Sequence, residues 1–98
     1  MKRPARAARD QAEMLAIQAL GFIAADRERL AAFLNVTGLA ADAIRIAANE
    51  PGFLAGVLDH LLADEALLTA FADDAGVDPG NIAKARRAFG GQWGRDLP

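Results

Sequence analysis

A repeat of 38 residues constrains the fold of this chain more than any other feature of its sequence. When the chain is shifted by 38 positions against itself, residues 20–48 align with residues 58–86 without a gap, and nine of the 29 aligned positions are identical. Self-similarity at a fixed period usually means that one supersecondary unit is used twice. We therefore expect two related units, repeat one at about 16–48 and repeat two at about 54–86.

The identical positions argue against chance matching among the many alanines and leucines. Asp26 aligns with Asp64, Phe33 with Phe71, and a glycine at 38 with one at 76. Each of these residue types has a structural role at its place, because aspartate caps helix N-termini and glycine ends helices. Phe33 and Phe71 are then expected as equivalent, buried anchors of the two units.

The composition predicts that both units are helical. Apolar residues make up 53% of the chain, but there is no Tyr and only one Trp, so the residue types that strands favour are scarce while alanine is abundant. At 98 residues the chain is too short for two independent cores. We expect an all-α fold, a compact bundle of about six helices built from two three-helix pseudo-repeats offset by 38 residues. The single domain should span 10–90, between a flexible basic tail at 1–9 and a C-terminal tail at 91–98.

Capping signals place the helices. The first helix should run from about residue 7 or 11 to 24, and Asp26, Asp64 and Asp78 should cap helices over about 27–35, 65–75 and 79–89. Gly38 and Gly76 should end the second and fifth helices. The third helix is expected over 40–48, and the fourth should open at 49–51, where a proline fits the first turn.

The charge and the apolar runs predict a cytoplasmic protein without a membrane segment. The net charge is −2, with four basic residues and no acid in 1–9, and seven acids without Lys or Arg in 46–83. The longest charge-free runs, 14–25 and 30–41, are 12 residues each, short of the roughly 18 that a membrane span needs. The absence of Cys suits a reducing compartment and excludes thiol chemistry.

A motif in the second unit resembles a known family. It comprises Phe53-Leu54, Val57-Leu58-Asp59, Leu61-Leu62, Asp64-Glu65 and Leu67-Leu68, followed by Phe71, Pro79, Ile82, Ala85, Arg86 and Gly90-Gly91. In these residues, over about 12–91, the chain resembles a family of short, uncharacterised proteobacterial proteins. The resemblance implies a small soluble helical domain with no assigned activity and no catalytic residues to carry over.

Residues 71–87 form a pattern typical of a helix-turn-helix. Ala72 lies four positions before the turn glycine Gly76, and apolar residues follow where a second helix would pack on the first. If this segment bound nucleic acid, the contacts would come from Asn81, Lys84 and Arg87 in the groove and Arg86 on phosphate.

The same segment carries charges that disfavour nucleic acid. Asp73, Asp74 and Asp78 are expected beside the basic residues of the last helix, where they should compensate them. Carboxylates near phosphates oppose binding that depends on neutralising the backbone. Nucleic-acid binding is therefore the alternative, and a protein partner is favoured.

No combination of residues predicts catalysis. His60 is the only histidine, beside Asp59 and one turn from Asp64, and the chain has no Ser or Cys to act as a nucleophile. The pair Asp64-Glu65 is typical of an N-cap with a first-turn acid. We expect no catalytic residue, no metal and no cofactor.

Trp93 is the candidate for partner binding. It lies between Gly91 and Gly94, so it either folds back onto an apolar groove or docks into a partner, and the first is favoured. The apolar surfaces of the first and fourth helices also leave room for a partner helix or a second copy. The sequence thus predicts a non-enzymatic protein-interaction or adaptor module, whose partner is another protein or the chain itself.

Overall fold

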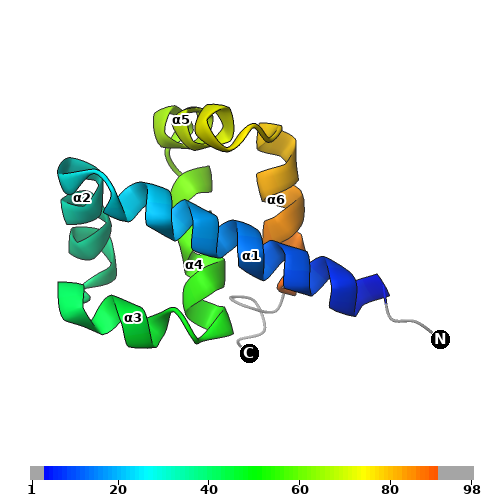
Figure 1. The fold of residues 1–98 in the computed structure, drawn as a ribbon, viewed down its shortest axis with the longest axis horizontal. Helices are drawn as coiled ribbons and strands as arrows, with labels where there is room; N and C mark the ends of the chain where they lie inside the picture. The colour runs from blue at the N-terminus through cyan, green and yellow to red at the C-terminus, as the bar shows by residue number, and fades with distance from the viewer. Residues whose placement is uncertain (1–3, 91–98) are drawn as a thin grey trace.

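The computed structural model describes residues 4–90, which form six α-helices and one short 3₁₀ helix (Figure 1). They are α1 (Pro4–Ala24), α2 (Arg27–Thr37), η1 (Ala41–Ala43), α3 (Ile44–Ala47), α4 (Pro51–Leu62), α5 (Glu65–Ala75) and α6 (Pro79–Ala88). The part of the chain that is described contains no strand, so the all-α prediction is confirmed.

Helices α1 and α4 form the centre of the molecule. Figure 1 shows α1 lying across α4, with α2 and α3 on one side and α5 and α6 on the other. Helix α1 contacts α2, α4, α5 and α6, and α4 also contacts α5 and α6. The central position of α1 explains why a broad surface of it is apolar.

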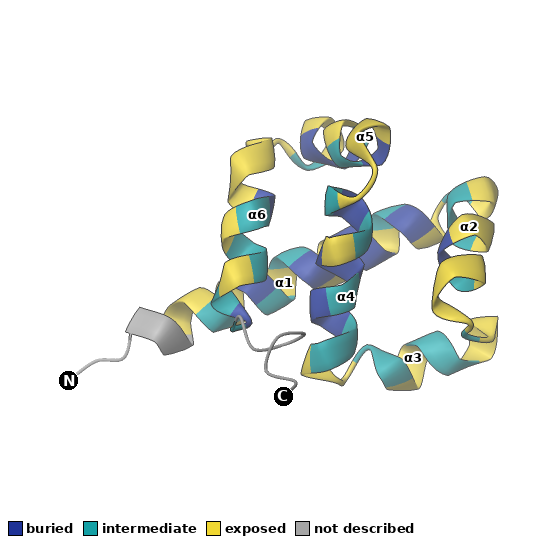
Figure 2. Ribbon diagram, turned by 180° about the vertical axis from the view of Figure 1, so that it is seen from behind, coloured by how far each residue is buried: buried dark blue, intermediate teal, exposed yellow. Residues whose placement is uncertain are grey.

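The core lies where α1 and α4 meet, as the buried residues in Figure 2 show. Three fully covered alanines of α1, Ala12, Ala16 and Ala19, let the helices approach closely. Helix α4 supplies larger side chains, because it is enclosed by α1, α5 and α6. Its buried residues are Leu54, Ala55, Val57, Leu58 and Leu61.

Each half of the molecule is anchored by one phenylalanine. Phe33 on α2 and Phe71 on α5 are both buried, as predicted. The ring of Phe33 lies 5.8 Å from that of Phe53, and the ring of Phe71 lies 5.5 Å from that of Phe22. Aromatic pairs at these separations stabilise a core beyond the area they bury.

The predicted caps are present at both ends of the repeated helices. The carboxylates of Asp26, Asp64 and Asp78 accept hydrogen bonds of 2.9 to 3.2 Å from backbone N–H groups in the first turns of α2, α5 and α6. Gly38 and Gly76 end α2 and α5 with φ of 75° and 71°. Glycine reaches this left-handed conformation without steric cost, whereas other residues are strained there.

Helix α1 begins earlier than expected. It starts at Pro4, so residues 4–9, which the charge pattern suggested as a tail, continue the helix. Proline is well tolerated in a first turn, and the alanines and arginines that follow are strong helix formers. Arg9 gains a role here, since its guanidinium lies 5.7 Å from the centre of the Phe89 ring at the end of α6.

The third helix of the first half is much shorter than expected. Residues 40–48 form one 3₁₀ turn, η1, followed by the four-residue α3, and none of the residues in either is buried. No side chain caps either element, whereas the aligned helix α6 starts with the Asp78 cap and Pro79. The halves thus share their caps, glycine ends and buried phenylalanines, and a full three-helix pseudo-repeat stays a prediction.

Within residues 4–90, no individual helix has both the length and the hydropathy that crossing a membrane requires. Residues Arg27–Thr37 and Ala41–Ala47 reach it only as a pair, and that pair is bent by 84°.

Candidate functional site

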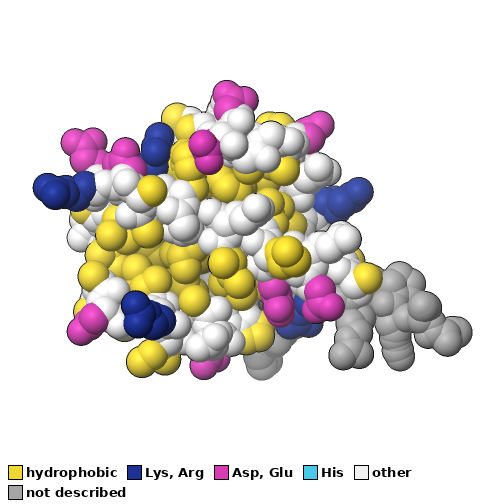
Figure 3. Space-filling view, viewed as in Figure 1, with side chains coloured by type: hydrophobic (Ala, Val, Ile, Leu, Met, Phe, Trp, Pro, Cys, Tyr) yellow, Lys and Arg dark blue, Asp and Glu magenta, His cyan; other side chains and the backbone are white. Residues whose placement is uncertain are grey.

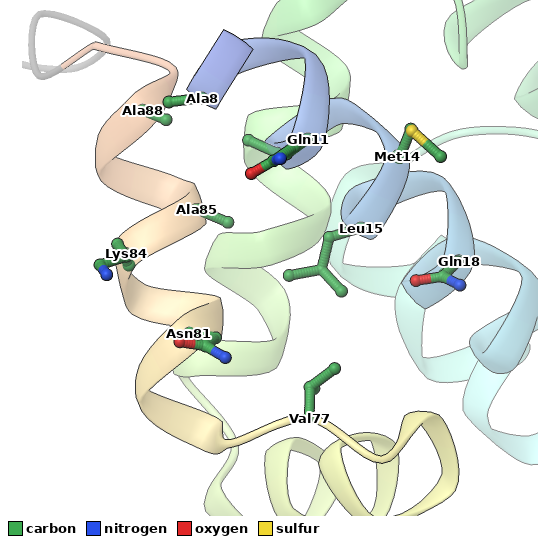
Figure 4. Close-up of a pocket in the computed structure, with 11 residues that line it drawn as sticks. Ala8, Gln11, Met14, Leu15, Gln18, Val77, Asn81, Lys84, Ala85 and Ala88 are labelled. Carbon is green, nitrogen blue, oxygen red and sulfur yellow. The ribbon is translucent and has the colours of Figure 1, made fainter. Parts of the chain in front are cut away.

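A groove of about 430 Å³ lies between α1 and α6 (Figure 4). Its apolar lining comes from Ala8, Ala12, Met14, Leu15, Val77, Ala85 and Ala88, and its polar lining from Gln11, Gln18, Asn81 and Lys84. The groove exists because alanines face one another across the two helices and leave space that larger side chains would fill.

The side chains in Figure 4 define a floor and two ends for this groove. Leu15 points from α1 toward α6, Ala85 points from α6 toward α1, and Val77 rises from the α5–α6 turn at one end. Ala8 and Ala88 lie together at the other end. The groove is therefore an apolar slot that runs along α6 and has one cation, Lys84, in its lining.

The end of α6 beside this groove is held firmly. Phe89 is buried, and Arg86 donates from Nε to Oδ1 of Asp59 on α4 at 2.7 Å. Arg86 also donates from Nη1 to the carbonyl oxygen of Gly90 at 3.4 Å. Gly90 has a φ of 98°, so the backbone turns sharply just beyond the helix.

The residues proposed for nucleic acid do not form one common surface. Asn81, Lys84 and Arg87 are exposed, but only 15% of the Arg86 side chain is, because it packs in its ion pair with Asp59. Asn81 and Lys84 line the groove toward α1.

The sequence predicts that nearby aspartates compensate the basic charges of α6, and for Arg86 the predicted aspartates are wrong. Its ion-pair partner is Asp59 of α4, and not the exposed Asp73, Asp74 or Asp78 near the turn. The two residues are 27 positions apart in sequence, so only the packing of α4 on α6 brings them together. No local signal in the sequence reports such a pair.

A second candidate surface is formed by α1, α2 and α3. Ile17 on α1, Val36 on α2 and Ile46 on α3 are 51%, 72% and 73% exposed. In Figure 3, hydrophobic side chains gather over the area that these three helices frame. We call Ile17, Val36 and Ile46 the aliphatic face, and in α3 the side chain of Ile44 packs against the core while that of Ile46 is left exposed.

His60 serves packing more than proton transfer. Its ring lies edge-on to Phe33, 5.1 Å between centres, and burial lowers the pKa of His60 while the charge of Asp64 opposes that shift. Among residues 4–90, no three His, Asp or Glu side chains lie close enough to hold a metal ion. The predicted partner-binding residue Trp93 lies outside the described residues.

Comparison with known proteins places the chain in a family. The model of a family described as "Protein of unknown function (DUF3572)" matches residues 9–92. The chain belongs to this family. The match spans the helices from the second turn of α1 to the end of α6, which confirms the resemblance to a family without an assigned activity. No curated protein and no solved structure matches the chain.

Proposed function

We propose that this protein is a non-enzymatic interaction or adaptor module that binds a helix of another protein on its aliphatic face. The observation that carries the proposal is the exposure of Ile17, Val36 and Ile46, each more than half accessible and each on a different helix. Single exposed apolar residues are ordinary, but a contiguous apolar surface on a small soluble domain is typical of an interaction site.

The energetics favour a protein partner for such a face. Covering apolar surface yields roughly 25 cal/mol per Å² removed from water. Large aliphatic side chains on three helices are exposed in the isolated chain, so a partner that covers them would gain binding free energy from their burial. An amphipathic helix is the partner that best fits, because its apolar side chains at positions i, i+3, i+4 and i+7 match a surface framed by helices.

The chemistry of the chain supports a role without catalysis. The sequence contains no Ser, Cys or Tyr, and its one histidine packs against the ring of Phe33. Nucleophilic catalysis needs an activated side chain with a base in hydrogen-bonding reach.

Nucleic-acid binding is the weaker alternative. The exposed carboxylates of Asp73, Asp74 and Asp78 lie in and beside the turn that would approach phosphates, and they reduce the gain from counterion release. We expect no sequence-specific duplex binding near physiological salt when labelled DNA is titrated with the protein. Tight binding that disappears with Lys84→Ala and Arg87→Ala would overturn the interaction-module proposal.

The proposal is tested by capturing partners from a native lysate with matched variants. Val36→Asp and Ile46→Asp place one carboxylate each in the aliphatic face, while Asn35→Asp adds the same charge at an exposed neighbour on α2. We expect a protein captured by the wild type and by Asn35→Asp to be lost with Val36→Asp and Ile46→Asp. Equal capture by all four forms would contradict the proposal. If the molecular mass of the wild type in solution doubles as its concentration rises, and Val36→Asp and Ile46→Asp both stay monomeric, the partner is instead a second copy of the chain.

A further inference from the structure

We infer that two copies of this chain bind each other antiparallel through α1, along a ridge on the outer side of that helix. The ridge consists of six exposed residues without charge: Ala7, Gln11, Met14, Gln18, Gly21 and Ala25. The inference goes beyond the proposed function, because the ridge contains none of the residues of the aliphatic face and its partner is a second copy of the chain.

The residues of the ridge follow one another at alternating spacings of four and three positions. This is the 3.5-residue repeat with which one helix keeps a seam against another helix. Ala25 directly follows α1, but its N–H group still donates to the carbonyl oxygen of Gly21 at 3.0 Å. The ridge therefore keeps helical geometry over its whole length of about 27 Å, and its spacing predicts a helix as the partner.

The ridge lies on a side of α1 that no other described helix covers. Helix α1 lies in front of α4 in Figure 1 and behind it in Figure 2, and the surface over its middle in Figure 3 shows neither acidic nor basic side chains. Exposed helix surfaces normally carry charge, and charged residues make up 24% of this chain. Met14 is 67% exposed, and a Cβ at Gly21 would meet no described atom within 4 Å. The ridge is therefore an uncharged surface that is open to a partner.

The ridge is complementary to itself when two copies run antiparallel. With residue 16 of both copies at the two-fold axis, the six residues of one ridge lie opposite those of the other in these pairs: Ala7 with Ala25, Gln11 with Gly21, and Met14 with Gln18. Gly21 then leaves the room that the longer side chain of Gln11 needs. A parallel pair would set Gly21 against Gly21 and leave a gap in the seam. Such a self-complementary contact is typical of two-fold homodimers.

The charges at the two ends of the ridge also select the antiparallel orientation. The first turn of α1 carries Arg6 and no acid. The other end borders a hollow between α1, α2 and α5, whose described lining includes Ala25, two acids, Asp26 and Asp74, and one cation, Arg29. The antiparallel register brings the basic first turn of the second copy to this hollow with its excess of acid. A parallel pair would bring two basic ends together.

Sedimentation equilibrium over a range of protein concentrations tests the pairing. Gly21→Glu places a carboxylate in the ridge and should leave the monomer folded, because the Cβ position is open and glutamate is a good helix former. Ala66→Glu is the matched control, since it adds the same charge at an exposed position of α5. Circular dichroism shows whether each variant keeps its helices.

We expect the wild type and Ala66→Glu to change from monomer to dimer as the concentration rises. Gly21→Glu should raise the dissociation constant more than about tenfold, because its carboxylate would lose water in the seam. A wild type that stays monomeric up to about 1 mM, or equal dissociation constants for Gly21→Glu and Ala66→Glu, would overturn the inference. Val36→Asp and Ile46→Asp should dimerise as the wild type does. Loss of the dimer in these two variants would place the contact on the aliphatic face and overturn the inference too.

Introduced cysteines test the orientation, because the chain has no Cys of its own. Met14→Cys and Gln18→Cys lie opposite each other in the antiparallel pair, whereas each lies opposite itself in a parallel pair. We expect a mixture of the two variants to form the mixed disulfide faster than either variant links to itself, with the products identified by mass spectrometry. Faster linking of each variant to itself would overturn the antiparallel arrangement.

Discussion

The two halves of the molecule share their local signals but differ in packing. In both halves an aspartate caps a helix of 11 residues, a phenylalanine anchors it, and a left-handed glycine ends it. In the second half, α6 then packs against α1 and α4, with Ile82 fully buried. In the first half, the aligned residues form η1 and α3, and Ile44, the counterpart of Ile82, is only partly buried against the core.

This difference shows that caps set where helices begin and end, while tertiary contacts decide whether a helix joins the core. Helix α6 has ten residues, an aspartate cap and a proline in its first turn. Helix α3 has four residues and no side-chain cap, and it packs on the core through the partly buried Ile44 and the adjoining Ala48. The half whose third helix packs less deeply is also the half that carries all three residues of the aliphatic face.

The largest expected loss of stability comes from the buried phenylalanine that each half contains. Phe33→Ala and Phe71→Ala should each lower the free energy of unfolding by about 3–5 kcal/mol, because each removes a fully buried ring. Urea denaturation measures both values, with Phe33→Leu and Phe71→Leu as milder controls. If the free energy of unfolding fell by less than about 1 kcal/mol at either position, the two phenylalanines would not be equivalent anchors.

The third helices should respond very differently to the same change. Ile82→Ala should cost about 2–5 kcal/mol, because the side chain is fully buried. Ile44→Ala, at the aligned position, should cost clearly less, about 1 kcal/mol, because that side chain is only partly buried. Similar losses in thermal or urea unfolding would mean that α3 packs as α6 does, and the comparison would fail.

In the second half, each aspartate cap should contribute less to the free energy of unfolding than a buried core residue does. Asp64→Ala and Asp78→Ala should each cost about 1 kcal/mol, since each leaves a first-turn N–H group without its partner. Asp73→Ala is the control, an exposed aspartate inside α5 that caps no helix. Equal effects of all three substitutions would assign the loss to charge and not to capping.

The smallest effect is a pH dependence from His60. Burial lowers the pKa of His60 below its ordinary value of 6.5, so the unfolded chain binds the proton more readily than the folded chain. Stability from this site is therefore complete above pH 6.5 and falls as the pH drops below it. His60→Gln should remove this part of the decline in melting temperature. A wild-type decline that the variant reproduces would place its origin in carboxylates.

Local chemistry explains which features the sequence predicts. Asp26, Asp64 and Asp78 act within two or three residues of themselves, and Gly38 and Gly76 act through their own backbone angles. The all-α class and the helix ends could therefore be predicted from composition and spacing.

Long-range packing explains what the sequence does not reveal. The pair of Arg86 and Asp59 depends on α4 lying beside α6, and the stacking of Arg29 on Phe22, at 4.5 Å, depends on how α2 leaves α1. The groove arises in the same way, because its alanines come from opposite ends of the chain. The short α3 differs from its aligned partner in how deeply it packs, because Ile44 is partly buried and Ile82 fully buried, and an alignment of helix signals does not report that difference.

Native-state hydrogen exchange tests the central difference between the halves most directly. We expect amides of α6 to exchange only with global unfolding, because that helix belongs to the core, while amides of η1 and α3 exchange through local opening at much lower free energy. Protection of the Ala48 amide, which donates to the carbonyl oxygen of Ile44 at 2.8 Å, reports on α3. If that amide were as strongly protected as the amides of α6, the two halves would not differ in the packing of their third helices.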